Sequence, residues 1–316
     1  MRKSYLRIIC LGVAMPSLVL AQTVVSTPIV GFYKKTFPAG GSLQTVALLK
    51  AVSYQGSASS VSGAVLSVSS PGWASNQFAP ANGLPAYYVE ITSGSRAGYI
   101  YDILSNGSAS VTVVDSDVAN AGSSPSFLIR AHTKISDVYA TATNLTDYND
   151  QITVYNSDGT NTTLLRDSST TTGWLDATTF VESDAVVYPS QGVVLSTGAS
   201  GQLTVTGSVK TTPTVVPLYA NQVNIVSLAN PSDVTKDVQT INLGTNLIEF
   251  NDQVGTYSSD GSLGQTNTLL WAGGAEGFYD ATTFSIASGV NITGTEPVIV
   301  TAGSNSIWTV TSPLQQ

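Results

Sequence analysis

Carboxylates are the side chains with the clearest chemical potential in this sequence. Asp176 and Asp280 each lie two residues after an aromatic residue and begin the same motif, Asp-Ala-Thr-Thr-Phe. Two carboxyl groups beside aromatic rings could form the acid and the nucleophile of a glycoside hydrolase. However, the two aspartates belong to two copies of one sequence block, and one active site rarely needs the same residue twice. Their repetition favours a repeated structural contact, so a carboxylate-dependent hydrolase is the least favoured interpretation.

A second group of oxygen-bearing side chains is also present twice. The residues concerned are Asp147, Asn149 and Asp150, with their counterparts Glu249, Asn251 and Asp252. Such clusters could bind calcium, or they could hold a turn by accepting hydrogen bonds from nearby backbone N–H groups. No calcium loop of recognised spacing is present, and Asp115-Ser116-Asp117 also lacks the third ligand and the glycine of an EF-hand loop. The turn is favoured, and the question of calcium stays open.

Histidine and cysteine chemistry is almost missing from the sequence. His132 is the only histidine and Cys10 the only cysteine. A lone histidine needs partners to act as a base or a metal ligand, so a structural role is favoured for His132. The sequence has no zinc-ligand spacing, phosphate-binding loop or nucleophile motif. We therefore predict no catalytic, cofactor-binding or metal-binding residues, and no cofactor.

Aromatic residues offer a better case for binding. Five of them crowd one stretch of the chain: Trp73, Tyr87, Tyr88, Tyr99 and Tyr101. Exposed aromatic rings can stack on sugar rings. Strand alternation instead places Tyr87 on one face with Val89 and Ile91, and Tyr88 on the other face with Glu90. Core packing is therefore favoured for most of these rings.

The elements that must position these groups are expected to be β-strands. The block T-N-L-T-D-Y-N-D-Q-I at 143–152 returns as T-N-L-I-E-F-N-D-Q-V at 245–254, a spacing of 245 − 143 = 102. The block G-W-L-D-A-T-T-F at 173–180 returns as G-F-Y-D-A-T-T-F at 277–284, a spacing of 277 − 173 = 104. A period near 100 residues is too long for a solenoid and suits a β-sandwich module.

The first copy is expected to be interrupted. Its N-terminal strand pair lies about 80 residues before the rest of the module, and the intervening stretch contains five or six short strands with Gly turns, typical of a small barrel. The predicted fold is all-β, with two duplicated β-sandwich-like modules and a small β-barrel-like insert in the first. The expected boundaries are 1–21 for a signal peptide, 22–50 plus 131–208 for the first module, 51–130 for the insert, and 209–316 for the second module.

Export is predicted by the first 21 residues. Arg2, Lys3 and Arg7 precede an apolar run at 8–20, which is the pattern of a secretory signal peptide. Its removal would change the formal charge from −8 to 9 − 20 = −11 and would remove Cys10, leaving no disulfide chemistry. This acidic balance argues against binding to nucleic acid. No later segment is long and apolar enough for a transmembrane helix after signal cleavage.

Four segments together resemble a known group of proteins. They are V-G-F-Y-K-K-T-F-P-A-G at 30–40, G-W-A-S-N-Q-F-A-P at 72–80, Y-Y-V-E-I-T-S-G-S-R-A-G at 87–98 and V-N-I-V-S-L-A-N-P-S-D-V at 223–234. They are similar to an uncharacterised family of exported, β-rich bacterial proteins that occurs as many paralogues in one genome. The resemblance implies export and a β-rich fold, and the family carries no assigned activity.

These observations favour an exported structural or interaction protein of the cell surface or matrix, adhesion-type and without catalytic activity. Surface polysaccharide or other envelope proteins are the expected partners, in the periplasm, on the cell surface or outside the cell. The alternative is a carbohydrate-binding module that uses the aromatic residues of the insert. The sequence indicates no oligomeric state.

Overall fold

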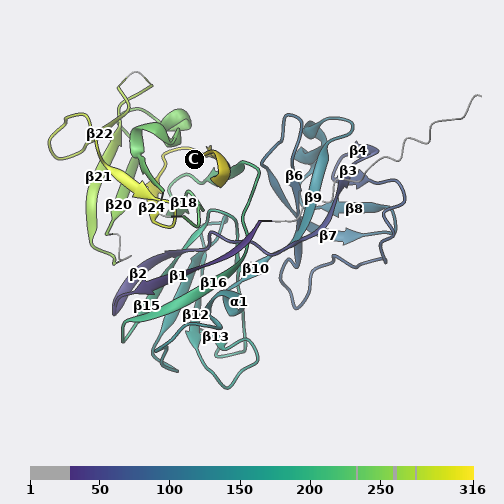
Figure 1. Cartoon of the computed structure of the whole chain (residues 1–316), viewed down its shortest axis with the longest axis horizontal. Coiled ribbons are helices and arrows are strands. Elements are labelled where there is room, and N and C mark those ends of the chain that lie inside the picture. Colours follow the sequence, from purple (N-terminus) through teal and green to yellow (C-terminus); the bar gives the residue numbers. More distant parts are fainter. Residues whose placement is uncertain (1–28, 233, 259–261, 275) are drawn as a thin grey trace, which may run out of the picture.

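The structure is a computed structural model that describes residues 29–232, 234–258, 262–274 and 276–316, and its regular elements are nearly all strands (Figure 1). The predicted all-β, β-sandwich-type fold is confirmed. The few helical elements are α1 (Ile135–Tyr139), η1 (Ser116–Ala121), η2 (Val238–Thr240), η3 (Leu243–Asn246) and η4 (Pro313–Gln315). Within the described part of the chain, none of them has the length and apolar character needed to cross a membrane. The predicted signal peptide lies outside the described residues.

Residues 29–50 and 131–208, here called the first unit, form two facing layers. One layer is an antiparallel sheet in the order β13 (Trp174–Asp176), β12 (Asn161–Arg166), β11 (Gln151–Tyr155), β15 (Gly192–Thr197), β2 (Gly40–Thr45). The other contains the long pair β1 (Val30–Phe37) and β16 (Gly201–Ser208), beside α1 and the short pair β10 (Thr133–Lys134) and β14 (Val186–Val187). Their alternating inward side chains enclose one hydrophobic cluster, which includes Phe37, Ile152 and Trp174.

Residues 209–316, the second unit, repeat this order of pairing. The sheet runs β22 (Phe278–Asp280), β21 (Gln265–Trp271), β20 (Gln253–Tyr257), β24 (Pro297–Thr301), β18 (Asn224–Ser227). The additional pairs are β17 (Thr214–Leu218) with β25 (Ser306–Val310), and β19 (Thr235–Asp237) with β23 (Asn291–Thr293). A separate hydrophobic cluster, with Phe278 and Trp308, fills this unit. The correspondence is one of strand order, and its origin by duplication stays a prediction.

Residues 51–130, the barrel unit, contain one curved sheet. Its order is β3 (Val52–Ser57), β9 (Ser126–Ala131), β6 (Tyr87–Ile91), β7 (Ile100–Asn106), β8 (Ser110–Val113), β5 (Val65–Ser67), β4 (Ser60–Ser62). β3 and β4 stand at opposite ends of this order, yet only Ala58 and Ser59 join them. The sheet must therefore curl until its ends approach each other, around a third hydrophobic cluster.

The three units are in direct contact with one another (Figure 1). At the end of β2, the Thr45 hydroxyl lies 2.7 Å from the Ser227 hydroxyl at the end of β18. The backbone N–H of Val215 in β17 donates to the carbonyl of Gly98 in the barrel unit, at 2.9 Å. Lys35 in β1 donates to the carbonyl of Thr295 in the second unit, at 2.7 Å. These polar contacts fix the edges at which a site between the units can form.

Lys35 should make stability depend on pH. Burial of its ammonium lowers the pKa of Lys35 to about 8, and nearby Glu296 offsets this only in part. Below pH 8 the folded protein holds this charge in a partly buried position. Between pH 8 and the unfolded pKa of about 10.4, the folded state has already lost a proton that the unfolded chain still binds, so stability rises with pH. Because the side chain is only partly buried, we expect a gain of about 1 kcal/mol.

The measurement compares the wild type with Lys35→Met by urea unfolding at several pH values from 7 to 10. The difference in unfolding free energy should shift in favour of the wild type as the pH rises. The comparison with the variant removes the contribution of the tyrosines, which titrate in both proteins. Parallel pH profiles would show that the Lys35 pKa is not depressed.

Candidate functional site

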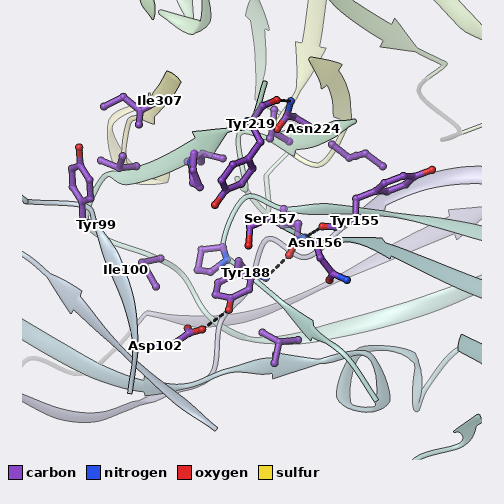
Figure 2. Close-up of a pocket in the computed structure, with 18 of the residues that line it drawn as sticks. Tyr99, Ile100, Asp102, Tyr155, Asn156, Ser157, Tyr188, Tyr219, Asn224 and Ile307 are labelled. Atoms are coloured by element: carbon purple, nitrogen blue, oxygen red, sulfur yellow. Dashed lines mark hydrogen bonds between the residues drawn. The ribbon is translucent and has the colours of Figure 1, made fainter. Parts of the chain in front are cut away.

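A cavity of about 490 Å³ lies where the three units meet. The barrel unit contributes the start of β7 to its wall. The first unit contributes the turn after β11 and the segment after β14. The second unit contributes β17, β18 and the turn between them. Figure 2 shows Asp102, Tyr188 and Tyr219, one from each unit, beside one another at this junction. This volume is within the usual range for small-molecule sites, which form preferentially between domains.

Tyrosine is the characteristic residue of the cavity wall. Five tyrosines line it: Tyr99, Tyr101, Tyr155, Tyr188 and Tyr219. The rings of Tyr99 and Tyr101 are stacked with centroids 6.3 Å apart, and the Arg96 guanidinium lies over Tyr99. Amide side chains also line the cavity, including Asn156, Gln191 and Asn224. The wall therefore combines flat apolar faces with neutral donors and acceptors of hydrogen bonds.

Asp102 connects two aromatic side chains of the first unit to the barrel unit. One carboxylate oxygen lies 2.9 Å from Nε2 of His132, and the other accepts the Tyr188 hydroxyl at 2.6 Å. Burial raises the pKa of Tyr188, and the adjacent Asp102 charge raises it further. The phenol is therefore neutral and its hydroxyl is already committed as a donor. The His132 ring packs between Tyr88 and Tyr188 and is almost fully buried.

The remaining lining carboxylates are also engaged. Asp117 accepts from the Arg96 guanidinium at 2.6 Å, and this bond is the main cause of the lowered pKa of Asp117. Asp115 accepts from the backbone N–H of Asp117 at 2.8 Å and so caps η1. Among the described lining residues, none is basic. The sequence motif Asp115-Ser116-Asp117 thus contributes a capped turn at the rim of the cavity.

The duplicated Asp-Asn cluster lies outside this cavity and holds a turn in each unit. Asp150 accepts from the N–H groups of Thr146 and Gly198, both at 2.8 Å, and from the Asn149 amide. Asp252 accepts in the same way from Ile248 and Gly303 at 2.9 and 2.8 Å, and from Asn251. Both carboxylates are fully buried. The described residues contain no group of three or more acidic, His or Cys side chains arranged to hold a metal ion.

Asp176 and Asp280 end equivalent strands of separate sheets. Asp176 accepts from the N–H groups of Thr178 and Thr179, at 3.0 and 2.7 Å. Asp280 accepts from Thr282 and Thr283, at 2.9 and 2.8 Å. These backbone bonds lower the pKa of both carboxyl groups. A general acid requires a raised pKa, so the geometry assigns these residues to turns rather than to proton transfer.

The aromatic residues singled out in the barrel unit divide between its core and the cavity. Trp73 is buried, and Tyr87 packs against the same hydrophobic cluster. Tyr99 and Tyr101 both line the cavity, but Tyr101 is only 6% exposed and also belongs to the hydrophobic cluster. The face of β6 that carries Tyr88 and Glu90 is closed as well, because Tyr88 is 2% and Glu90 0% exposed. Tyr88 is therefore not available to stack on a sugar.

A buried cluster of charges explains why that face is closed. Lys210, in the connector between β16 and β17, donates to Glu90 at 2.7 Å, and the Thr212 hydroxyl also donates to Glu90. The Arg130 guanidinium lies 3.6 Å from the other Glu90 oxygen. Burial lowers the pKa of Lys210, although Glu90 opposes this shift. Sequence reasoning did not find this cluster, although charged residues at strand positions are a usable signal in a chain with only 10% charged residues.

The chain matches no family model, no curated protein and no solved structure. The resemblance to exported bacterial proteins thus stays a prediction.

Proposed function

We propose that this chain is an exported, non-catalytic binding protein whose junction cavity holds a neutral, hydroxyl-rich ligand of the saccharide class. The sequence predicts a surface or matrix interaction protein, and the proposal adds the class of ligand that it binds. It also assigns binding to aromatic residues at the junction instead of those inside the barrel unit. The observation that carries it is the set of five tyrosines lining one cavity between the three units.

The chemistry of the wall supports a neutral ligand. An anionic ligand would find no countercharge, since none of the described lining residues is Lys or Arg. A cationic ligand is not required either, because Asp102 and Asp117 already have donors. Sugars combine C–H faces, which pack on aromatic rings, with hydroxyls that amides and carboxylates recognise. The tyrosine rings offer the first kind of contact. The amides of Gln191 and Asn224 already bond to backbone groups, so the second kind falls to other lining amides, such as those of Asn156 and Gln222.

The same residues argue for binding rather than catalysis. His132 is buried beneath Tyr88 and Tyr188, so its ring has no path to a substrate. The raised pKa of Tyr188 keeps its phenol protonated, which makes it a poor base. The duplicated aspartates are occupied by backbone N–H groups of their own turns. Export remains part of the proposal and is supported by the basic and apolar pattern of residues 1–21.

Tyr219 provides the direct test. Tyr219→Ala removes a ring from the cavity wall, and we expect it to weaken binding of a neutral oligosaccharide by about 10-fold or more. Tyr188→Phe keeps an aromatic ring and loses only the hydrogen bond to Asp102, so we expect a smaller loss of affinity for the oligosaccharide. Binding is first sought on an array of neutral oligosaccharides and then measured by calorimetry.

The matched control is Tyr279→Ala, which removes a partly exposed tyrosine of β22 that does not line the cavity. This variant should bind like the wild type. The proposal fails if the wild type binds no neutral oligosaccharide on the array. It also fails if Tyr219→Ala binds as tightly as the control.

A further inference from the structure

Four exposed aromatic residues occupy corresponding places in the first and second units. Tyr148 and Phe180 of the first unit are 64% and 61% exposed, and Phe250 and Phe284 of the second are 62% and 67% exposed. They are the equivalent aromatic positions of the two repeated sequence blocks. Core packing explains why Trp174 and Phe278 are both aromatic, but it cannot explain four rings that face solvent.

All four residues also have a left-handed backbone. Their φ angles are 59° for Tyr148, 56° for Phe180, 54° for Phe250 and 52° for Phe284. This region is unfavourable for bulky side chains and suits Gly or Asn. A strained residue that persists points to a role outside folding. The fold needs these turns, but an aromatic ring is the wrong choice for their conformation.

The turns are held by groups other than the rings. The N–H of Tyr148 donates to Arg166 and that of Phe250 to Trp271, at 2.9 and 2.7 Å. The N–H groups of Phe180 and Phe284 donate to the backbone carbonyls of Asp176 and Asp280, at 2.8 and 2.9 Å. These are main-chain bonds that an asparagine at the same positions would also make. The Tyr148 hydroxyl donates to Asp167, and the three phenylalanine side chains have no group that could form such a bond.

The two units that carry these residues pack in a reciprocal way. Thr45 and Ser227, which touch, are the last residues of β2 and β18 and lie opposite the first residues of β15 and β24. In addition, β15 contacts β18 while β24 contacts β2. Equivalent surfaces thus meet each other, as in an isologous dimer with a two-fold axis. The exposed aromatics are therefore presented twice, in positions related by this local symmetry.

We propose that these four rings are a second binding surface, two platforms in each unit, for an extended neutral polysaccharide. Phe180 and Phe284 follow β13 and β22, the edge strands farthest from the contact between β2 and β18. Only a long polymer could therefore reach both units at once, and this would raise its apparent affinity through effective concentration. This surface is separate from the junction cavity and does not depend on the function proposed for it.

The surroundings of the rings favour this partner over others. Asp147 and Glu249 immediately precede two of the rings, and the whole chain has a net charge of −8, so an anionic polymer would be repelled. Two of the rings, Phe180 and Phe284, directly follow a pair of threonines, and the other two, Tyr148 and Phe250, are directly followed by an asparagine. Isolated flat rings with hydroxyl neighbours suit single sugar residues, whereas a stable protein interface requires roughly 800 Å² of continuous surface per partner.

The test uses the full chain with asparagine at these positions, because asparagine tolerates the left-handed turn. The variants are the first-unit pair Tyr148→Asn with Phe180→Asn, the second-unit pair Phe250→Asn with Phe284→Asn, and all four together. Retention is measured on insoluble cellulose, chitin and starch, with alginate as an anionic polymer. Thermal unfolding of each variant is recorded in parallel.

We expect the wild type to be retained on at least one neutral polymer. Each pair variant should lose about 10-fold in apparent affinity, and the fourfold variant about 100-fold or more. The unfolding midpoint should be unchanged or raised by about 1 to 4 °C, because strain is relieved. Leu314→Asn, at another exposed apolar side chain, should change neither quantity.

Three outcomes would overturn the proposal. The first is no retention of the wild type on any of the three neutral polymers. The second is stronger retention on alginate than on every neutral polymer. The third is a fourfold variant that binds the polymer like the wild type. If the unfolding midpoint of that variant is also lowered, the rings stabilise the fold instead of binding a ligand.

Discussion

Replacement of Glu90 by Gln is expected to lower the free energy of unfolding by about 3 to 5 kcal/mol, because it leaves buried cations without their counterion. Glu90 is fully buried between Lys210 at 2.7 Å and Arg130 at 3.6 Å, and both cations are themselves buried. Its carboxylate is the only negative charge among these three residues. The neutral amide cannot compensate two positive charges that have lost their contact with water.

Lys210→Met is the informative comparison for this effect. It removes one cation and leaves Glu90 beside Arg130, so one buried charge pair persists. Replacement of a buried charge by an apolar side chain of similar length is often tolerated, and we expect a loss of about 1 to 2 kcal/mol. In the double variant, Glu90→Gln should cost less than it does alone, because only Arg130 is then left unpaired.

Urea unfolding of the four proteins measures this cycle. The expected coupling between Glu90 and Lys210 is at least about 1 kcal/mol in the stabilising direction. Equal losses for the two single variants, or additive losses in the double variant, would contradict a carboxylate shared between two cations. Because Lys210 lies in the connector and Glu90 in β6, the same result would establish that the connector stabilises the barrel unit.

The sequence predicted the local features of this fold well. The Asp-Gly turn at 158–159 closes the hairpin of β11 and β12, as expected for that dipeptide. The clusters around Asp150 and Asp252 accept bonds from nearby backbone N–H groups, which is what Asn and Asp do in turns. The hairpin turn and the bonds from Thr146 and Ile248 join residues within a few positions of each other, so a single sequence contains the necessary information, whereas the bonds from Gly198 and Gly303 are long-range and were not predicted.

The candidate site could not be predicted in the same way. Asp102, Tyr188 and Tyr219 meet only because three units come together, and no local pattern records their proximity. Alternation along β6 separates Tyr88 and Glu90 from the hydrophobic face, and it does not reveal that the connector covers them. The left-handed conformation of Phe180 and Phe284 was hidden for a related reason, since aromatic residues are not expected at such turns.

Asp150→Ala and Asp252→Ala are each expected to lower the free energy of unfolding by about 2 to 4 kcal/mol, because each leaves buried N–H donors without an acceptor. Asp150 and Asp252 accept bonds from two backbone N–H groups and one amide apiece, and one of those bonds joins the turn to a distant loop, at Gly198 or Gly303. Similar losses in the two variants would mean that the two units use the same turn in the same way.

Asp158→Ala is the matched control for these two variants. Asp158 also accepts from a backbone N–H and a hydroxyl, both of Thr160, but it is exposed, so water can replace its bonds and the loss should be clearly smaller than for Asp150→Ala or Asp252→Ala. Millimolar calcium, or its removal by a chelator, should not move the wild-type unfolding midpoint, since the oxygens of Asp150 and Asp252 are already committed to N–H donors. An unfolding midpoint raised by calcium would instead show that the clusters bind this metal. Losses no larger than that of Asp158→Ala would show that burial of these carboxylates does not determine the stability of either unit.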